Sequence, residues 1–144
     1  MRKILLGIAV ALMPVLTYAE WTNQDGYQWS YATLRDGGIR ITDVSPYPEG
    51  EFEIPASLDG LTVVEFDAYS ALRNVSALTI PSSVRDITSS CGYVSEVRIS
   101  DLKAFYKICD AGFGSQVGGF RLFLNGSEVK SLDIHEESVY EYGG

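Results

Sequence analysis

The chain of 144 residues has one histidine, two cysteines and no long apolar run after its first nineteen residues. A site built from two histidines is therefore excluded, and no Cys-x-x-Cys pair, Gly-x-Ser-x-Gly elbow or phosphate-binding glycine motif occurs. The adjacent carboxylates Glu136 and Glu137 would point to opposite faces of a strand, which does not suit paired acid and base catalysis. The sequence predicts that the protein is not an enzyme and that it holds no metal or cofactor.

Positive charge is also scarce. The chain has 11 Lys and Arg against 19 Asp and Glu, which gives a net charge of -8. After residue 19 the basic residues are scattered singly, so no patch is present there that could neutralise a row of phosphates. Nucleic acids and anionic membrane surfaces are therefore disfavoured as partners.

Residues 1–19 differ from the rest of the chain. Arg2 and Lys3 precede an almost wholly apolar run over residues 4–12, and Thr17-Tyr18-Ala19 places small residues at the two positions that signal peptidase reads. The run is shorter than the ~20 residues that a membrane-spanning helix needs, and Pro14 interrupts it. We expect residues 1–19 to be a signal peptide and the protein to be exported to the cell surface, the medium or the periplasm.

Three short strands repeat one pattern along the chain. The apolar-polar-apolar segments around Ile54, Ile80 and Ile99 lie 26 and then 19 residues apart, and the first two are followed by proline. A fourth copy is Leu132-Asp133-Ile134. Repeats of this length stack as coils that bury a shared core. We therefore expect Ile54, Ile80, Ile99 and Ile134 to form a core ladder of about four rungs.

The residues before the repeats predict a hairpin. Tyr27, Trp29 and Tyr31 alternate with polar or small residues, and an Asp-Gly-Gly turn separates them from Ile39-Arg40-Ile41. The pattern predicts strands over 26–34 and 38–42, followed by a loop over 43–50 that contains two prolines. The aromatic row suits either a cover for an open core or a platform for stacking sugars, and we favour the cover.

Other local signals lie within and after the repeats. Asp59-Gly60 marks a turn, residues 66–72 could form one or two helical turns, and residues 101–108 suit a short helix capped by Ser100 or Asp101. Asn125-Gly126 is a strong signal for a two-residue hairpin, with residues 129–134 as its return arm.

With these motifs, the chain resembles the BspA-like leucine-rich repeat family of exported and surface proteins. The resemblance rests on Ile-Pro-x-x-(Leu/Val) at residues 54–58 and 80–84 and on Cys-x-x-Val-x-x-Val-x-Ile at residues 91–99. It implies an α+β, mainly β fold: a short leucine-rich-repeat solenoid of about four coils with an N-terminal β-hairpin cap and few short helices. The expected parts are the signal peptide over 1–19, the cap and loop over 20–50, and the solenoid over 51–144, with the cap and solenoid in one domain.

The exposed positions of the repeated strands are the candidate binding residues: Glu53, Thr79, Arg98 and Asp133. Stacked coils place equivalent side chains on one continuous face. The resulting hypothesis is a monomeric, exported module that binds a protein or glycan partner by this face. The alternative is a structural or degenerate N-terminal fragment of a larger repeat array without activity of its own.

Cys91 and Cys109 are the only cysteines, and a pair in an exported chain suggests a disulfide. Their separation of 18 residues is about one coil, so stacking could bring them together. The resemblance instead implies a buried free thiol at Cys91. The sequence leaves both states open.

Overall fold

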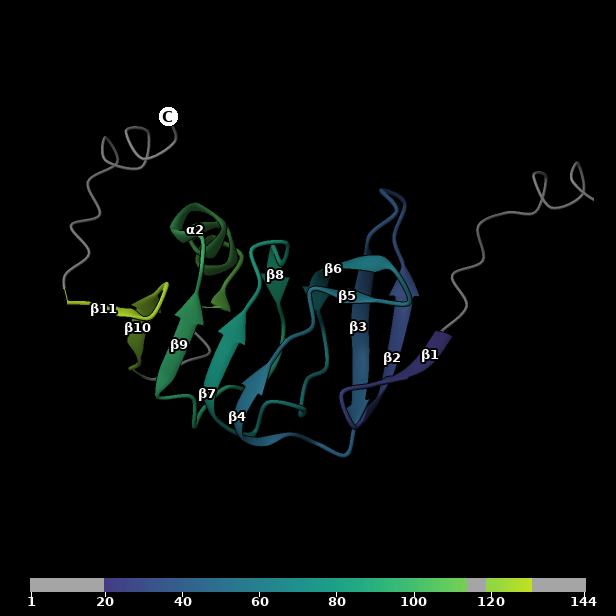
Figure 1. The fold of residues 1–144 in the computed structure, drawn as a ribbon, viewed down its shortest axis with the longest axis horizontal. Helices are drawn as coiled ribbons and strands as arrows, with labels where there is room; N and C mark the ends of the chain where they lie inside the picture. Colours follow the sequence, from purple (N-terminus) through teal and green to yellow (C-terminus); the bar gives the residue numbers. More distant parts are fainter. Residues whose placement is uncertain (1–19, 114–118, 131–144) are drawn as a thin grey trace, which may run out of the picture.

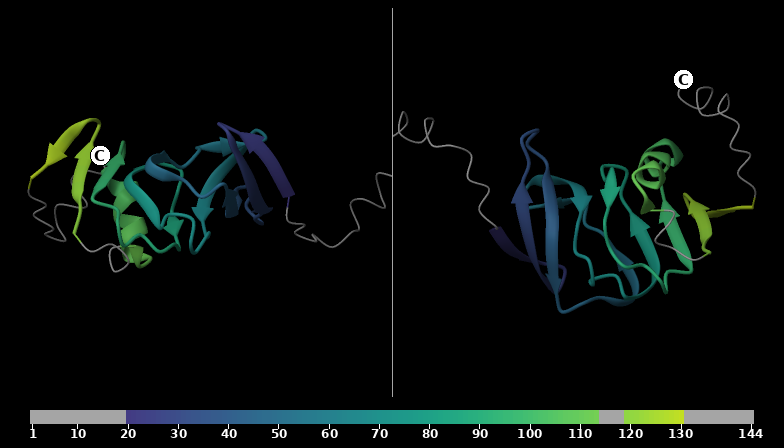
Figure 2. Two further views of the ribbon diagram at one scale, coloured as in Figure 1. Left: turned by 90° about the horizontal axis from the view of Figure 1, so that it is seen from below. Right: turned by 180° about the vertical axis from the view of Figure 1, so that it is seen from behind.

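The computed structural model describes residues 20–113 and 119–130, and these residues are mostly β with one short helix. The expected signal peptide, the rung at Ile134 and the candidate residue Asp133 lie outside the described residues. Two sheets lie side by side along the long axis of the molecule (Figure 1). Figure 2 shows the same order from behind.

The first sheet, called here the hairpin sheet, has the strand order β1-β2-β3-β6-β5, with β8 also paired to β6. Its strands are β1 (Glu20–Gln24), β2 (Tyr27–Thr33), β3 (Ile39–Ser45), β5 (Ser57–Leu58), β6 (Leu61–Phe66) and β8 (Asp86–Ile87). The predicted hairpin is confirmed as the antiparallel pair β2–β3. The sequence pattern missed β1 and β6.

The turn between β2 and β3 needs its two glycines for different reasons. Gly37 has a φ of 88°, a conformation that favours glycine. A Cβ at Gly38 would lie 2.8 Å from a methyl carbon of Val64, so only a residue without a side chain lets β6 approach so closely.

The predicted loop over residues 43–50 is wrong at both ends. Strand β3 continues to Ser45, and β4 (Glu49–Glu53) already begins at Glu49. Both prolines fall in the short connection between the strands, where they need not donate a ladder hydrogen bond. Gly50 fits into β4 because the register shifts at Gly50/Glu51 and β4 lies at the sheet edge.

The second sheet, called here the ladder sheet, has the order β11-β10-β9-β7-β4. Its other strands are β7 (Asn74–Ile80), β9 (Glu96–Ile99), β10 (Arg121–Leu124) and β11 (Ser127–Val129). β4, β7, β9 and β10 run parallel, each one coil further along the chain, so the repeated strands lie next to one another as the repeats predict.

The fourth described rung differs from the expected one. Ile80 is in register with Ile99, and Ile99 is in register with Leu124 of β10. The Asn125-Gly126 hairpin between β10 and β11 is confirmed, with φ angles of 50° and 84° at the turn. The sequence predicted β10 as a hairpin arm but not as a rung. Its parallel pairing with β9 joins residues that are separated by α2 and the segment after it, and no local pattern reveals such a pairing.

The connections between rungs are mostly irregular. Residues 67–73 form successive turns with hydrogen bonds from Ala71 N to Ala68 O and from Val75 N to Leu72 O, not the helical turns expected there. The segment between β6 and β7 is so short that its few helical hydrogen bonds would not offset the free-energy cost of helix nucleation. The predicted helix after β9 is confirmed as α2 (Leu102–Asp110), whose N-cap Asp101 accepts a hydrogen bond from Ala104 N.

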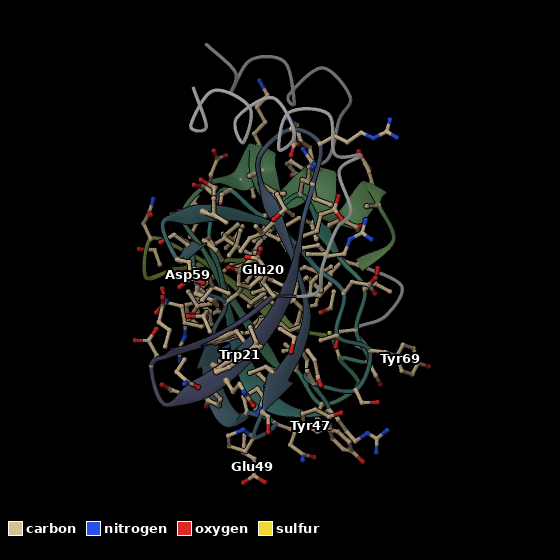
Figure 3. All side chains as sticks on the ribbon, turned by 90° about the vertical axis from the view of Figure 1, so that its right-hand side faces the viewer. Glu20, Trp21, Tyr47, Glu49, Asp59 and Tyr69 are labelled. Atoms are coloured by element: carbon tan, nitrogen blue, oxygen red, sulfur yellow. The ribbon has the colours of Figure 1, made fainter. Side chains whose placement is uncertain are left out.

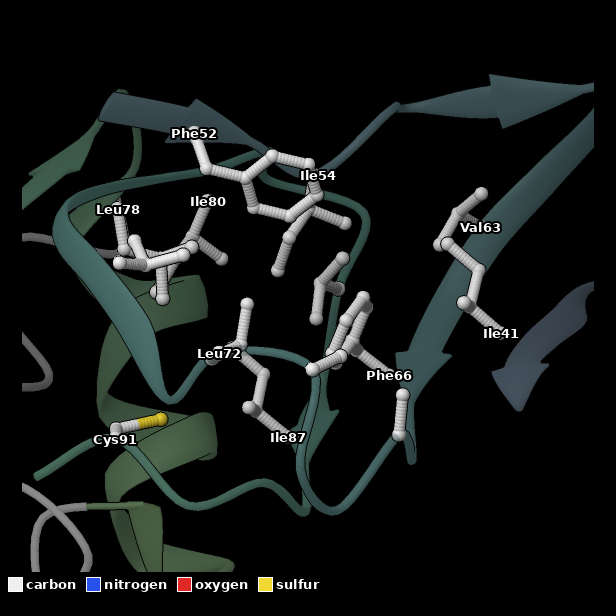
Figure 4. Packing of buried hydrophobic residues seen from close by; sticks show 14 of the residues in the cluster. Ile41, Phe52, Ile54, Val63, Phe66, Leu72, Leu78, Ile80, Ile87 and Cys91 are labelled. Carbon is white, nitrogen blue, oxygen red and sulfur yellow. The ribbon is translucent and has the colours of Figure 1, made fainter. Parts of the chain in front are cut away.

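One continuous core connects the two sheets (Figure 4). Leu78 and Ile80 from the ladder sheet, with Ile54 directly after β4, contribute to the same buried cluster as Val63 and Phe66 from the hairpin sheet. Trp29 stacks on Phe52 with ring centroids 5.8 Å apart, which joins β2 to β4. Tyr27 and Trp29 of the aromatic row therefore pack against the first strand of the ladder sheet, and the role of residues 20–50 as a cap stays a prediction.

A polar cluster fastens β1 to the turn between β5 and β6. The hydroxyl of Tyr31 lies 2.9 Å from a carboxylate oxygen of Glu20 and 2.7 Å from one of Asp59, and Thr22 also donates to Asp59. Glu20 and Asp59 lie close together on this side of the molecule (Figure 3). A hydroxyl has one proton, so Tyr31 donates to one carboxylate at a time. The flanking carboxylates raise the pKa of Tyr31, and the donated bonds lower the pKa of Asp59.

We expect Ile80→Ala to lower the free energy of unfolding by about 3 kcal/mol, because the side chain is 3% exposed and its removal leaves a cavity. Thr79→Ala, on the outer side of the same strand, should cost less than about 1 kcal/mol. Urea denaturation measures both values. Equal losses would contradict the assignment of the inward and outward faces.

Tyr31→Phe should lower the free energy of unfolding at neutral pH by about 1 kcal/mol, because it removes the hydrogen bond from the hydroxyl to a carboxylate. The loss is modest because water can hydrogen-bond to that carboxylate instead. Because the pKa of Asp59 is lowered in the folded protein, this stabilisation is fully present at pH values above the ordinary pKa of 3.8. It is lost as the pH falls below 3.8 and Asp59 becomes protonated. The difference between wild type and variant should therefore shrink in acid. Tyr47→Phe, at a half-exposed tyrosine, is the control, and a pH-independent difference would contradict the expected role of Asp59.

Candidate functional site

The outer side of the ladder sheet carries two rows of side chains that lie in register across the strands. Between the rows are the buried residues Phe52, Leu78, Val97 and Leu122, which point into the core. We call the outward residues the ladder face; its first row is Glu51, Ala77, Glu96 and Arg121, and its second row is Glu53, Thr79, Arg98, Phe123 and Glu128.

Opposite charges alternate across the ladder face. Arg98 lies 3.1 Å from carboxylate oxygens of both Glu51 and Glu96. Arg121 lies 3.6 Å from Glu96 and donates two hydrogen bonds to Glu128. The Arg98–Glu51 pair joins β9 to β4, so it crosses the intervening strand β7, where Ala77 is only 6% exposed. The centre of the face is therefore covered by charged side chains.

The ion pairs keep their acidic members ionised. Hydrogen bonding from Arg98 lowers the pKa of Glu51, and hydrogen bonding from Arg121 lowers the pKa of Glu128. Both carboxylates are exposed, so these pairs contribute little to stability. They hold long side chains in defined positions. The guanidinium of Arg121 also lies 5.0 Å from the ring centre of Phe123.

Three of the four predicted binding residues are neighbours in one row. Glu53 is in register with Thr79, and Thr79 is in register with Arg98. The fourth, Asp133, lies outside the described residues, and Phe123 is the next residue of the row. The first row was not among the predicted residues. Those residues lie two positions before the predicted ones in each strand, so the same alternation could have found them.

A cleft borders the ladder face along β4. Its volume is about 370 Å³, and it lies between the edge of β4, the β1–β2 turn and the segment after β4. The lining residues are Gln24, Asp25, Tyr27, Trp29, Glu51, Phe52, Glu53, Pro55, Ala56 and Ser57. Glu51 and Glu53 belong both to this cleft and to the ladder face. No local pattern in the sequence indicates the cleft, because its walls come from separate parts of the chain.

Both cysteines are free thiols, Cys91 buried and Cys109 partly buried. Desolvation raises the pKa of Cys91 to about 12, so its thiolate form is disfavoured. The disulfide left open by the sequence stays a prediction: two reactive thiols on unfolded, non-reduced protein would exclude it, and none would establish it.

Metal-ligating side chains do not gather in the part of the chain that the structure describes, where no group of three or more His, Cys, Asp or Glu could hold an ion. His135 lies outside that part. Over the same residues, no helix has the length and apolar character needed to cross a bilayer.

Comparisons with known proteins give one likeness. No protein-family model matches the chain, and no curated protein matches it. Among solved structures, the chain is similar to a leucine rich cell surface protein from Faecalibacterium prausnitzii A2-165, with 17% sequence identity and a TM-score of 0.45. The likeness covers 74% of this chain and 33% of that protein, so this chain spans about a third of that protein's length.

Proposed function

We propose that the chain is an exported leucine-rich repeat protein that binds a protein or glycan partner at or outside the cell surface, and that the ladder face is its binding surface. The observation that carries the proposal is the register of the ladder face. Its two rows cross adjacent strands of one sheet, and stacked repeats commonly bind partners by such surfaces.

The proposed architecture follows the repeats. Residues 1–19 are a signal peptide, residues 20–50 a cap with its connection, and residues 51–144 a solenoid of about four coils in one domain with the cap. The parallel pairing of β4, β7, β9 and β10 supports the stacking of coils. N-terminal sequencing of the exported protein should give Glu20 as its first residue, and a start at Met1 would contradict the proposed cleavage.

The binding role is tested by a triple variant, Glu53→Ala, Thr79→Ala and Arg98→Ala. We expect binding to a panel of extracellular proteins and arrayed glycans to weaken by at least about tenfold, because three neighbouring contacts are removed from one row. The residues are on the outer face, so the fold should persist, which circular dichroism verifies.

The matched control changes the same kinds of residue elsewhere: Asp43→Ala, Thr62→Ala and Lys103→Ala, all exposed. It should leave binding unchanged. If binding survives the ladder variant and is lost in the control, the site lies elsewhere. If the folded wild-type chain binds neither proteins nor glycans, the alternative of a structural or degenerate fragment of a larger array is favoured.

A further inference from the structure

The edge of the ladder sheet at β4 is open. β4 is the last strand in its sheet and pairs only with β7, because the hairpin sheet continues through β6 instead. Figure 1 shows β4 at the border between the two sheets. The cleft lies along this edge and includes three consecutive β4 residues, Glu51, Phe52 and Glu53.

The main-chain groups at this edge have a defined direction. Ile54 N donates to Thr79 O at 3.0 Å. The N–H and C=O groups of Phe52 and Ile54 therefore point toward β7. In a parallel pair, alternate residues direct both N–H and C=O to the same side. Glu51 and Glu53 therefore direct their main-chain groups toward the cleft, and no described residue hydrogen-bonds to them there. An edge of this kind is a template for a further strand.

The rim of the cleft is acidic and partly unpaired. Asp25, Glu51 and Glu53 are its three carboxylates, and all three are exposed. Glu51 is paired with Arg98, whereas Asp25 and Glu53 have no cationic partner among the described residues. The cleft also has an aromatic floor, made by Tyr27, Trp29 and Phe52, whose ring centres lie 5.6 to 5.8 Å apart. Carboxylates above an aromatic ring are a suitable site for a guanidinium.

Hydrogen bonds hold the walls in place. Gln24 donates from its side chain to Ser57 O at 3.1 Å, and Trp29 Nε1 donates to Gln24 O at 3.0 Å. These bonds fix the β1–β2 turn, which carries Asp25, against the segment after β4. The cleft is therefore preorganised, which lowers the entropy cost of binding a ligand.

A peptide fits this cleft better than a sugar does. A stacked sugar needs an open ring face, but Trp29 is 1% exposed and Phe52 5% exposed, so only Tyr27 offers ring surface. A row of free main-chain donors and acceptors is the feature that an extended peptide uses. The volume of about 370 Å³ is near the lower end of the ~300–1,000 Å³ of small-molecule pockets, which suits one long side chain.

We propose that an extended segment of a partner protein adds to the free edge of β4 and places an arginine side chain in the cleft between Asp25, Glu53 and Tyr27. This names the class of partner and rests on the proposed binding function. The peptide backbone supplies hydrogen bonds to Glu51 and Glu53, and the arginine supplies charge complementarity to the acidic rim.

The test uses the purified full exported chain and an array of short peptides of random sequence. We expect the bound peptides to be enriched in arginine next to β-branched residues. For the best peptide, measured by fluorescence anisotropy, replacing arginine by uncharged citrulline should weaken binding by about tenfold. N-methylation of the peptide amides that face β4 should weaken it similarly, whereas N-methylation of the alternate amides should not.

The protein variant for this test is Asp25→Asn with Glu53→Gln, which should also weaken peptide binding by about tenfold. Asparagine suits position 25, where φ is 53°. The control, Asp67→Asn with Asp110→Asn, removes the same charge from exposed residues outside β4 and the cleft lining and should have no effect.

The remaining outcomes separate this inference from the proposed function. Peptide binding without a preference for arginine, or unaffected by the cleft variant, would overturn the inference. If the triple ladder variant loses its partner while the cleft variant keeps it, the binding function stands and the inference is wrong. Selection of glycans instead of peptides, sensitive to the cleft variant, would make the cleft a sugar site and also overturn the inference.

Discussion

The burial of alternate side chains along the parallel strands is the constraint on which the rest of the structure depends. A strand such as β9, with four residues, cannot bury its apolar side alone. Placed between β7 and β10, it adds Val97 and Ile99 to a core that each neighbouring coil extends. The hairpin sheet closes the first end of this core through the contact of Trp29 with Phe52. The order of the parallel strands and the packing of the hairpin sheet against β4 both follow from this requirement.

The same alternation creates the ladder face. Once Phe52, Leu78 and Val97 point inward, the residues on either side of them must point outward, and the parallel register aligns them across the sheet. The charges on this face are arranged in pairs, with Arg98 between two glutamates. Because these pairs are exposed, their main effect is on the shape and charge pattern of the surface and less on stability.

At the border between the two sheets, one edge of β4 has no strand paired to it among the described residues. The hairpin sheet takes β6 as its next strand, so β4 has a partner on one side only. The β1–β2 turn stands over this edge and is held there by Gln24. A free strand edge, an aromatic floor and two carboxylates without a cationic partner among the described residues therefore occur in one place, where three segments of the chain meet.

Features set by neighbouring residues could be predicted from the sequence. The Asn125-Gly126 and Asp59-Gly60 turns, the helix capped by Asp101 and the inward positions of Ile54, Ile80 and Ile99 depend on only a few adjacent residues, and each is present. The predicted loop over 43–50 was too long. Proline and glycine indicate that a strand is interrupted, but they do not show that the interruption is confined to a short connection. The predicted row of Glu53, Thr79 and Arg98 followed from the repeat spacing alone.

Only the tertiary structure decided which distant segments meet. The pairing of β10 with β9, the place of Phe123 in the predicted row and the ion pair of Arg98 with Glu51 join residues from different strands. The free edge of β4 and its cleft depend on β3 pairing with β6, a choice that no local pattern contains. By itself, the sequence determined the rungs and the turns, because these are local. The tertiary structure decided the ion pairs of the ladder face and the cleft beside it, because their residues come together only when the whole core is packed.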